Sequence, residues 1–266
     1  MCIRDRASEL NFKIDKTTLR AIEENSSLIK KVSPERVRDE FTKILLSNYL
    51  RRGFKLLYCL GLLRFIMPEL QKYAGIAREN FRGDEDLLEH TFDMAASLPP
   101  DLILRLSILL FNLKSRSCQD EKEEITAKIL RRLRFKNTVI RKVTMLTQEN
   151  WRAINFSNKK NIRQLASRVG MENLEYAWEL KKALIVGNNG SKRFKSAEIK
   201  RAENNIREIL QERPPVSHKD LAVKGKDLIE LGYKEGKEVG QVLKELLKLV
   251  LEKPELNQKE KLLKII

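Results

Sequence analysis

The chain has 266 residues, of which 42% are hydrophobic and 34% charged, so it is long enough to bury a core and too apolar to be disordered. Aromatic residues make up only 6%, which argues against a β-sandwich or barrel, and no apolar run approaches the roughly 20 residues that span a bilayer. The net charge is +16, and residues 121–195 carry 18 Lys and Arg against 7 Asp and Glu, which predicts a polyanionic partner.

The N-terminal part of the chain shows helix-start signals and helical spacing. Asp15 is placed to cap a helix. The run Ser33-Pro34-Glu35 combines a hydroxyl cap, Pro at the first helical position and an acid near the positive helix end. A third helix, at about 50–60, is expected to end at Gly61.

The middle of the chain continues this pattern. Asp101 and Asn137 are expected to cap helices that follow them. The expected helices cover about 86–97, 101–113, 121–133, 137–148, 160–169 and 171–186.

The C-terminal part begins with a long helix at about 196–212. Ser217 and Asp220 have capping-box spacing, and Asn257 with Glu260 is predicted to cap a last helical turn. Polar stretches at 71–85 and 187–191 are the plausible boundaries between modules, so the sequence predicts an all-α chain in three parts.

An apolar segment ending in Phe111-Asn112 resembles the metal-binding helix of the HD superfamily of phosphohydrolases, which carries a His-Asp pair at this kind of position. Phe has no lone pair to donate and an Asn carbonyl is a weak ligand, so one remaining histidine, His90, is expected to be a buried remnant. The acidic run Asp84-Glu85-Asp86 has no strand or Gly-rich loop beside it and is expected to precede a helix. We therefore expect neither catalytic residues nor a metal site in this chain.

Blocks in one consistent order over almost the whole chain resemble the C-terminal half of bacterial tRNA nucleotidyltransferases, the CCA-adding enzymes and their poly(A) polymerase relatives. The blocks include Ala7-Ser8-Glu9-Leu10, Ser33-Pro34-Glu35-Arg36-Val37-Arg38-Asp39-Glu40, Gly61-Leu62-Leu63 and Gly225-Lys226-Asp227-Leu228. In that family a catalytic head precedes a helical neck, body and tail, and the resemblance begins inside the neck. Residues 1–6 do not fit the family pattern.

The resemblance implies a neck at 7–70, a degenerate HD-like body at 71–186 and a helical tail at 187–266. It also implies that the partner is tRNA and that the protein is cytoplasmic. No cofactor is expected in this chain, whereas Mg and CTP or ATP are expected for the catalytic head of the family. The three cysteines, without ligand or disulfide spacing, suit a reducing compartment.

Two groups of cations are the candidate RNA-binding residues, since exposed cations are what backbone phosphates attract. The first group is Arg131, Arg132, Arg134, Lys136, Arg141 and Lys142, and the second is Lys159, Lys160, Arg163 and Arg168. Lys192, Arg193 and Lys195 are weaker candidates. Between the groups, Trp151 and Phe156 could stack on an unpaired base, although core packing is the commoner fate of such residues. The alternative for the cations is a solvated helix face.

The block around Ser33 also resembles a motif that supports the nucleotide-selecting region in the family. By that resemblance Glu35, Arg36, Arg38 and Asp39 would be structural supports of the neck, while an ordinary capped helix explains Ser33-Pro34-Glu35 equally well. Glycines around Leu231-Gly232-Tyr233 either form a phosphate-binding hairpin or only stop helices. His218 is expected in a cap region.

Two rival functions stay open. One is a degenerate HD-type helical domain for protein–protein interaction or regulation, which predicts a sizeable exposed apolar patch. The other is an HD-type hydrolase with an unusual site, which Phe111 and Asn112 disfavour.

Overall fold

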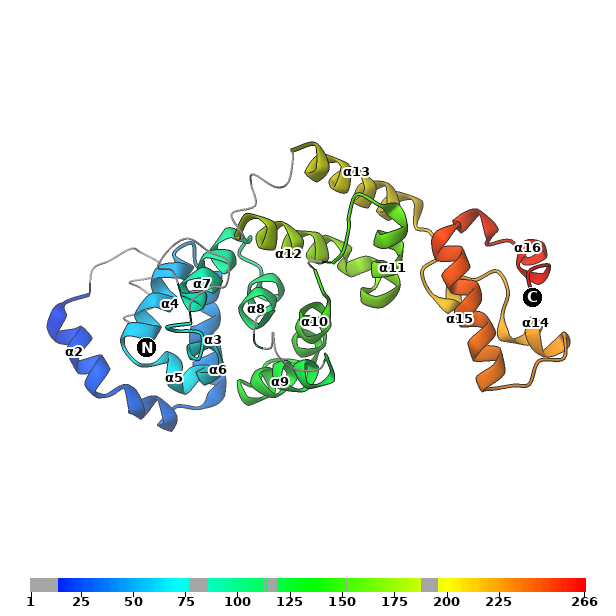
Figure 1. Cartoon of the computed structure of the whole chain (residues 1–266). Helices are drawn as coiled ribbons and strands as arrows, with labels where there is room; N and C mark the ends of the chain where they lie inside the picture. The colour runs from blue at the N-terminus through cyan, green and yellow to red at the C-terminus, as the bar shows by residue number, and fades with distance from the viewer. Residues whose placement is uncertain (1–13, 77–85, 112, 114–118, 152, 188–195) are drawn as a thin grey trace. The chain divides into compact units, whose positions relative to one another are not determined.

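The computed structural model describes residues 14–76, 86–111, 113, 119–151, 153–187 and 196–266, and these residues form helices and no β-strand (Figure 1). This confirms the all-α prediction. The chain divides into two compact units, Met1–Trp151 with Glu179–Gly190 and Arg152–Trp178 with Ser191–Ile266. The three-module division drawn from the sequence stays a prediction. Among the described helices, none has the length and apolarity to cross a membrane.

The first unit opens with short helices whose starts follow local chemistry. They are α2 (Lys16–Glu24), η1 (Ser26–Lys31), α3 (Pro34–Leu46), α4 (Leu50–Cys59), α5 (Leu63–Ile66) and α6 (Pro68–Gln71). Asp15 caps α2 by accepting from the Thr17 amide at 2.8 Å. The third helix ends beside Gly61 as predicted, because the positive φ of 65° suits glycine. Helix α3 begins at Pro34 as predicted, although the Ser33 side chain makes no capping hydrogen bond.

The same unit continues with α7 (Leu87–Ser97), α8 (Leu102–Phe111), α9 (Gln119–Arg132) and α10 (Asn137–Gln148). Asp86 and Asp101 accept from amides three residues on, at 2.8 and 2.9 Å, so both cap the helices that follow them. The Asn137 prediction is wrong by one position: Asn137 is the first residue of α10, and Lys136 holds the cap position in extended conformation.

The core of the first unit lies around α8, which packs against α3, α7 and α10. Residues 104–110 of α8 are all buried, as expected for a helix enclosed on every side. The rings of Phe41, Phe54 and Phe92 are 5.2 and 5.3 Å apart in succession and join α3, α4 and α7.

Arg105 is the charged member of this buried stretch, with 4% of its surface exposed. Its Nη1 donates to the Leu45 and Ser47 carbonyls at 2.6 and 2.9 Å, and its Nε and Nη2 donate to the Leu98 carbonyl at 3.2 and 2.9 Å. One guanidinium thus satisfies carbonyls at the C-terminal ends of α3 and α7, which helices leave without internal partners.

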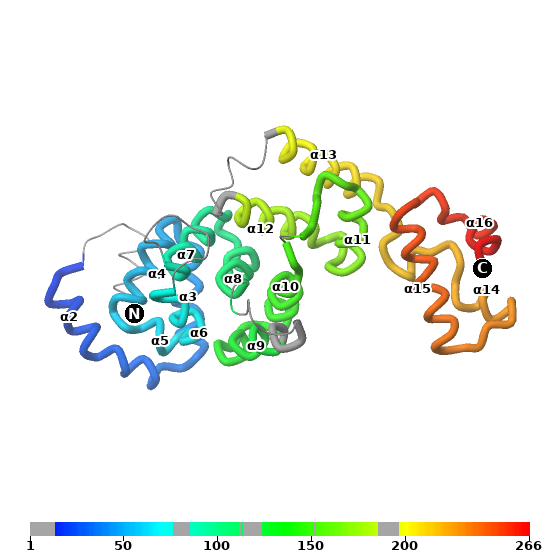
Figure 2. Tube along the Cα trace, in the orientation of Figure 1, coloured from blue at the N-terminus to red at the C-terminus, as the bar shows by residue number. Residues whose placement is uncertain are grey.

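The second unit contains the C-terminal helices traced in Figure 2. Helix α12 (Leu174–Gly187) contributes residues to both units. The remaining elements are α11 (Lys159–Val169), η3 (Met171–Asn173), α13 (Ser196–Glu212), η5 (His218–Asp220), α14 (Gly225–Glu230), α15 (Lys237–Glu252), η6 (Pro254–Leu256) and α16 (Lys259–Leu263).

Of the two helix caps predicted for this unit, one is confirmed and the other is wrong. Ser217 and Asp220 form the predicted capping box, and His218 begins η5 in that cap region. Asn257 does not cap the last turn, which begins after Gln258. Instead its Oδ1 accepts from the Ala222 amide at 2.8 Å and its Nδ2 donates to the Asp220 carbonyl at 2.9 Å, because a tertiary partner outcompetes the local cap.

Candidate nucleic-acid interface

The first predicted basic group surrounds a tight turn that ends α9. The Arg134 amide donates to the Arg131 carbonyl at 2.9 Å and the Phe135 amide to the Leu130 carbonyl at 3.0 Å, the pattern of a Schellman motif. Arg134 occupies the left-handed position with φ 57°, where glycine is usual and a side chain costs about 1 kcal/mol or more. The turn leaves 67% of the Arg134 side chain exposed, and Phe135 and Leu130 are buried.

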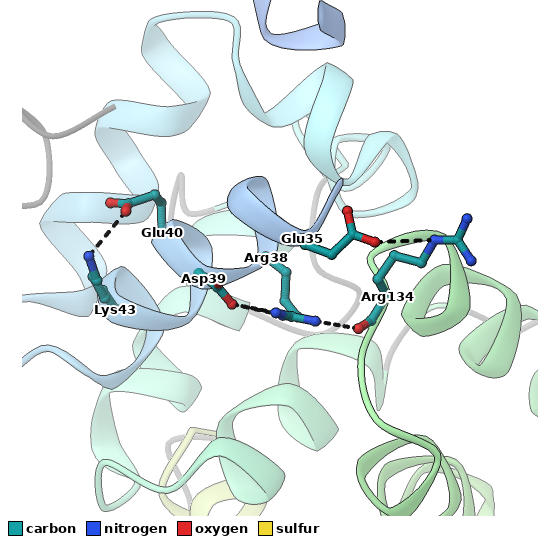
Figure 3. Close-up of polar contacts among 6 residues, drawn as sticks. All are labelled: Glu35, Arg38, Asp39, Glu40, Lys43 and Arg134. Carbon is teal, nitrogen blue, oxygen red and sulfur yellow. Dashed lines mark hydrogen bonds and ion pairs between the residues drawn. The ribbon is translucent and has the colours of Figure 1, made fainter. Parts of the chain in front are cut away.

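Helix α3 holds this turn from the side (Figure 3). Arg38 Nη1 donates to the Arg134 carbonyl at 2.6 Å, and Glu35 Oε1 lies 3.7 Å from Arg134 Nε. The Nε and Nη2 of Arg38 also donate to Asp39 Oδ1 at 2.9 and 2.7 Å, which fixes the guanidinium. Two of the four predicted support residues, Glu35 and Arg38, therefore contact the basic turn. Asp39 contacts Arg38, and Arg36 is exposed. Their support of a nucleotide-selecting region stays a prediction.

Arg132 is tied to α6 rather than left free. Its Nη1 and Nη2 each donate to a Glu69 carboxylate oxygen at 2.7 Å. Burial raises the pKa of the Glu69 carboxyl, but the hydrogen bonds and the charge of Arg132 outweigh it, and the Glu69 pKa is lowered overall. Donating these hydrogen bonds to Glu69 in turn raises the pKa of Arg132.

The other members of this group differ in how available they are. Lys142 is half-buried. Arg131, Lys136 and Arg141 are exposed, and no carboxylate in the described part of the chain pairs with them. Together with Arg134, these three side chains place four exposed cations at the end of α9, in the turn that follows it and on α10.

The second basic group is engaged inside the second unit. Lys159 Nζ lies 2.6 Å from Glu208 and 3.4 Å from Glu212, and the hydrogen bond to Glu208 raises the pKa of Lys159. Lys160 pairs with Glu252. Phosphate would have to compete with these carboxylates.

Arg163 is buried, with 8% of its surface exposed. It donates to the Leu251 and Glu252 carbonyls at 2.7 and 2.9 Å, so it closes the C-terminal end of α15. Burial lowers its pKa. Arg168, in the same helix, is exposed and donates to the Gln164 carbonyl at 3.2 Å. RNA contact by the second group stays a prediction, and Lys192, Arg193 and Lys195 lie outside the described residues.

The two aromatic candidates are core residues. Trp151 is 1% exposed and its Nε1 donates to the Leu146 carbonyl at 3.0 Å. Phe156 is 3% exposed, and its ring lies 5.2 Å from that of Trp178. Core packing, the commoner fate, therefore holds for both, and neither ring is available for stacking on a base.

The segment that resembles a metal-binding helix also lies in the core. His90 is 6% exposed on α7, as predicted, while Asn112, Asp84 and Glu85 lie outside the described residues. Asp86 is used as a helix cap and also accepts from the Gly75 amide at 3.0 Å. Within the described residues no three His, Cys, Asp or Glu side chains gather in a group able to hold a metal ion.

Comparison with known proteins gives matches over nearly the whole chain. Residues 116–266 match the family model described as "tRNA nucleotidyltransferase domain 2 putative", and residues 11–73 match the model described as "Probable RNA and SrmB- binding site of polymerase A". The CCA-adding enzyme of Ligilactobacillus salivarius is 25% identical over 257 residues, covering 95% of this chain and 54% of the relative. That of Enterococcus faecalis is 28% identical over 261 residues, covering 97% and 55%.

A solved structure has the same fold. The crystal structure of the Bacillus stearothermophilus CCA-adding enzyme in complex with CTP superposes with a TM-score of 0.65 at 20% identity, over 97% of this chain and 57% of that one. The chain thus spans about half the length of the relatives it matches.

Proposed function

Because the chain belongs to the tRNA nucleotidyltransferase family, we propose that it is the tRNA-holding neck, body and tail of a CCA-adding enzyme. It grips the acceptor arm and elbow of tRNA through phosphate contacts, in the cytoplasm, while a catalytic head using Mg and CTP or ATP adds CCA to the 3′ end. The observation that carries this proposal is a turn of exposed cations inside the family-matched region, at residues 131–141.

The geometry of this turn suits phosphate binding. Arg131, Arg134, Lys136 and Arg141 are exposed, and each phosphate that they neutralise releases condensed counterions and adds salt-dependent affinity. Helix α3 holds the backbone of the turn through Arg38, so less conformational freedom is lost on binding.

The test is a titration of the full chain with tRNA at several salt concentrations, read by fluorescence anisotropy. Replacing Arg131, Lys136 and Arg141 together with Ala should make the negative slope of log K against log salt shallower. The expected change is about 0.7–0.9 for each phosphate that is no longer neutralised. The resulting loss of affinity is roughly 100-fold at 0.1 M salt.

A matched control removes the same charge from cations that already have partners. Lys43, Arg51 and Lys55 pair with carboxylates in the same unit, so their replacement with Ala should change the slope less. No tRNA affinity in the unaltered chain, or equal slopes for the two triple variants, would refute the proposal. The first of these results is what a degenerate HD-type interaction domain predicts.

A further inference from the structure

A second cationic surface lies on η1 and α5, outside the residues that the charge pattern singled out. The Lys30 Nζ lies 5.0 Å from the centroid of the Phe65 ring, and the Arg64 guanidinium carbon lies 4.8 Å from it. Lys30, Lys31 and Arg64 are exposed, and Phe65 is half-buried. Two cations thus share one aromatic ring, with a third cation next in the chain.

Arg64 is held in place although it is exposed. Its Nη2 donates to the hydroxyl of Ser26 at 3.3 Å, and Ser26 is only 3% exposed. A β-carbon at Gly61 would lie 3.3 Å from the same Nη2, so the glycine leaves the room that the guanidinium occupies. The ring, the hydroxyl and the glycine together fix the direction of a charged group that would otherwise sample many rotamers.

Within the described residues, Lys30, Lys31 and Arg64 have no carboxylate partner, unlike other cations of the unit. Arg51 pairs with Asp93 at 2.7 Å, Lys55 with Glu89 at 3.1 Å and Arg132 with Glu69 at 2.7 Å. For the η1–α5 cations no ion pair exists with any carboxylate in the described ranges. Like charges gathered around one ring repel each other, and an anion bound between them would relieve that repulsion.

From this arrangement we propose that Lys30, Lys31 and Arg64 form a binding site for a backbone phosphate of the RNA, with Phe65 holding the cations in position. The site rests on the proposed function and adds a phosphate-binding position outside the 131–141 turn. It lies inside the region that matches the family model for residues 11–73, whose description mentions RNA binding without naming residues.

In the sequence, the only sign of this site is the pair of dipeptides Lys30-Lys31 and Arg64-Phe65. Neither stands out in a chain with 53 Lys and Arg, since more than thirty residues separate the two pairs along the chain. Only the packing of η1 against α5 brings them together.

The test compares two variants of the full chain in tRNA titrations against salt. The first variant combines Lys30→Ala, Lys31→Ala and Arg64→Ala. Its negative slope of log K against log salt should be shallower by about 0.7–0.9 for each phosphate that the variant fails to neutralise. The triple replacement of Lys43, Arg51 and Lys55 with Ala removes the same charge from paired positions and serves as the control. A slope as steep as that of the control variant would overturn the inference.

A second variant separates positioning from charge. Phe65→Leu keeps every cation and is expected to weaken binding about two- to five-fold with an unchanged salt slope, because only the placement of the cations changes. An unchanged affinity would overturn the positioning role of Phe65. If the unaltered chain binds no tRNA, the proposed function fails, and this site with it. If it binds and only the 131–141 variant loses affinity, this site alone fails.

Discussion

Replacing Arg105 with Met tests whether one buried guanidinium holds two helix ends together. The side chain donates to the carbonyls of Leu45, Ser47 and Leu98 at 2.6–3.2 Å, and burial lowers its pKa. Met fills a similar volume but has no donor, so three carbonyls lose their partner. Among the residues that the structure describes, no carboxylate accepts a hydrogen bond from Arg105, so the substitution isolates the helix-end carbonyls.

The expected magnitude follows from those three carbonyls. A net hydrogen bond contributes about 0.5–1.5 kcal/mol, more when the donor is charged, and a buried carbonyl left without a partner costs about 1–3 kcal/mol. Removing the desolvated charge and burying the Met side chain offset part of this loss. We therefore expect a loss of about 3 kcal/mol in the free energy of unfolding of the first unit.

Thermal unfolding followed by circular dichroism measures this loss. For a unit of this size about 3 kcal/mol corresponds to a fall of roughly 6–12 °C in Tm. Arg105→Lys keeps the charge without the planar fork and should fall between the Met variant and the unaltered chain. The control is Arg131→Met on the exposed end of α9, expected within about 0.5 kcal/mol. An Arg105→Met variant as stable as the control would refute the reasoning.

Three further predictions concern single side chains. Arg132 lowers the pKa of Glu69, so the ionised carboxylate stabilises the folded first unit at pH values above its unfolded pKa of roughly 4.3. This stabilisation is lost as the pH falls through the lower folded pKa. Glu69→Gln should therefore make the free energy of unfolding depend less on pH in that range. Asn257→Ala should lower the unfolding free energy of the second unit by about 1–2 kcal/mol and speed hydrogen exchange at the Ala222 amide, and unchanged exchange there would contradict it. Arg134→Gly should stabilise the first unit by about 1 kcal/mol while weakening tRNA binding, and a lower Tm would show that its left-handed backbone is not strained.

Much of the fold was predictable because helix starts depend on neighbours in sequence. Asp15, Asp86 and Asp101 cap helices through amides two or three residues away, and Pro34 begins α3 because its fixed φ suits a first turn. The same local reasoning failed at Asn257, whose partners lie 35 and 37 residues away.

The candidate interface was predictable only in part, because charge along the sequence does not show which cations have partners. Arg131 and Arg132 are adjacent in α9, yet only Arg132 reaches Glu69, 63 residues away. In the second basic group, Arg163 lies in the helix with Lys159 and Arg168 but is buried against carbonyls 88 and 89 residues further on.

By itself, therefore, the sequence determined the helical class, most helix starts and the basic character of the middle region, since all of these follow from interactions within a few residues. The tertiary structure alone decided which cations bind carbonyls or carboxylates of distant helices, as Arg105, Arg132 and Arg163 do. It also decided which cations have no carboxylate partner among the described residues, as is the case for Lys30 and Arg64. The physical reason is that a guanidinium binds whichever carbonyl or carboxylate the packing of distant helices brings to it.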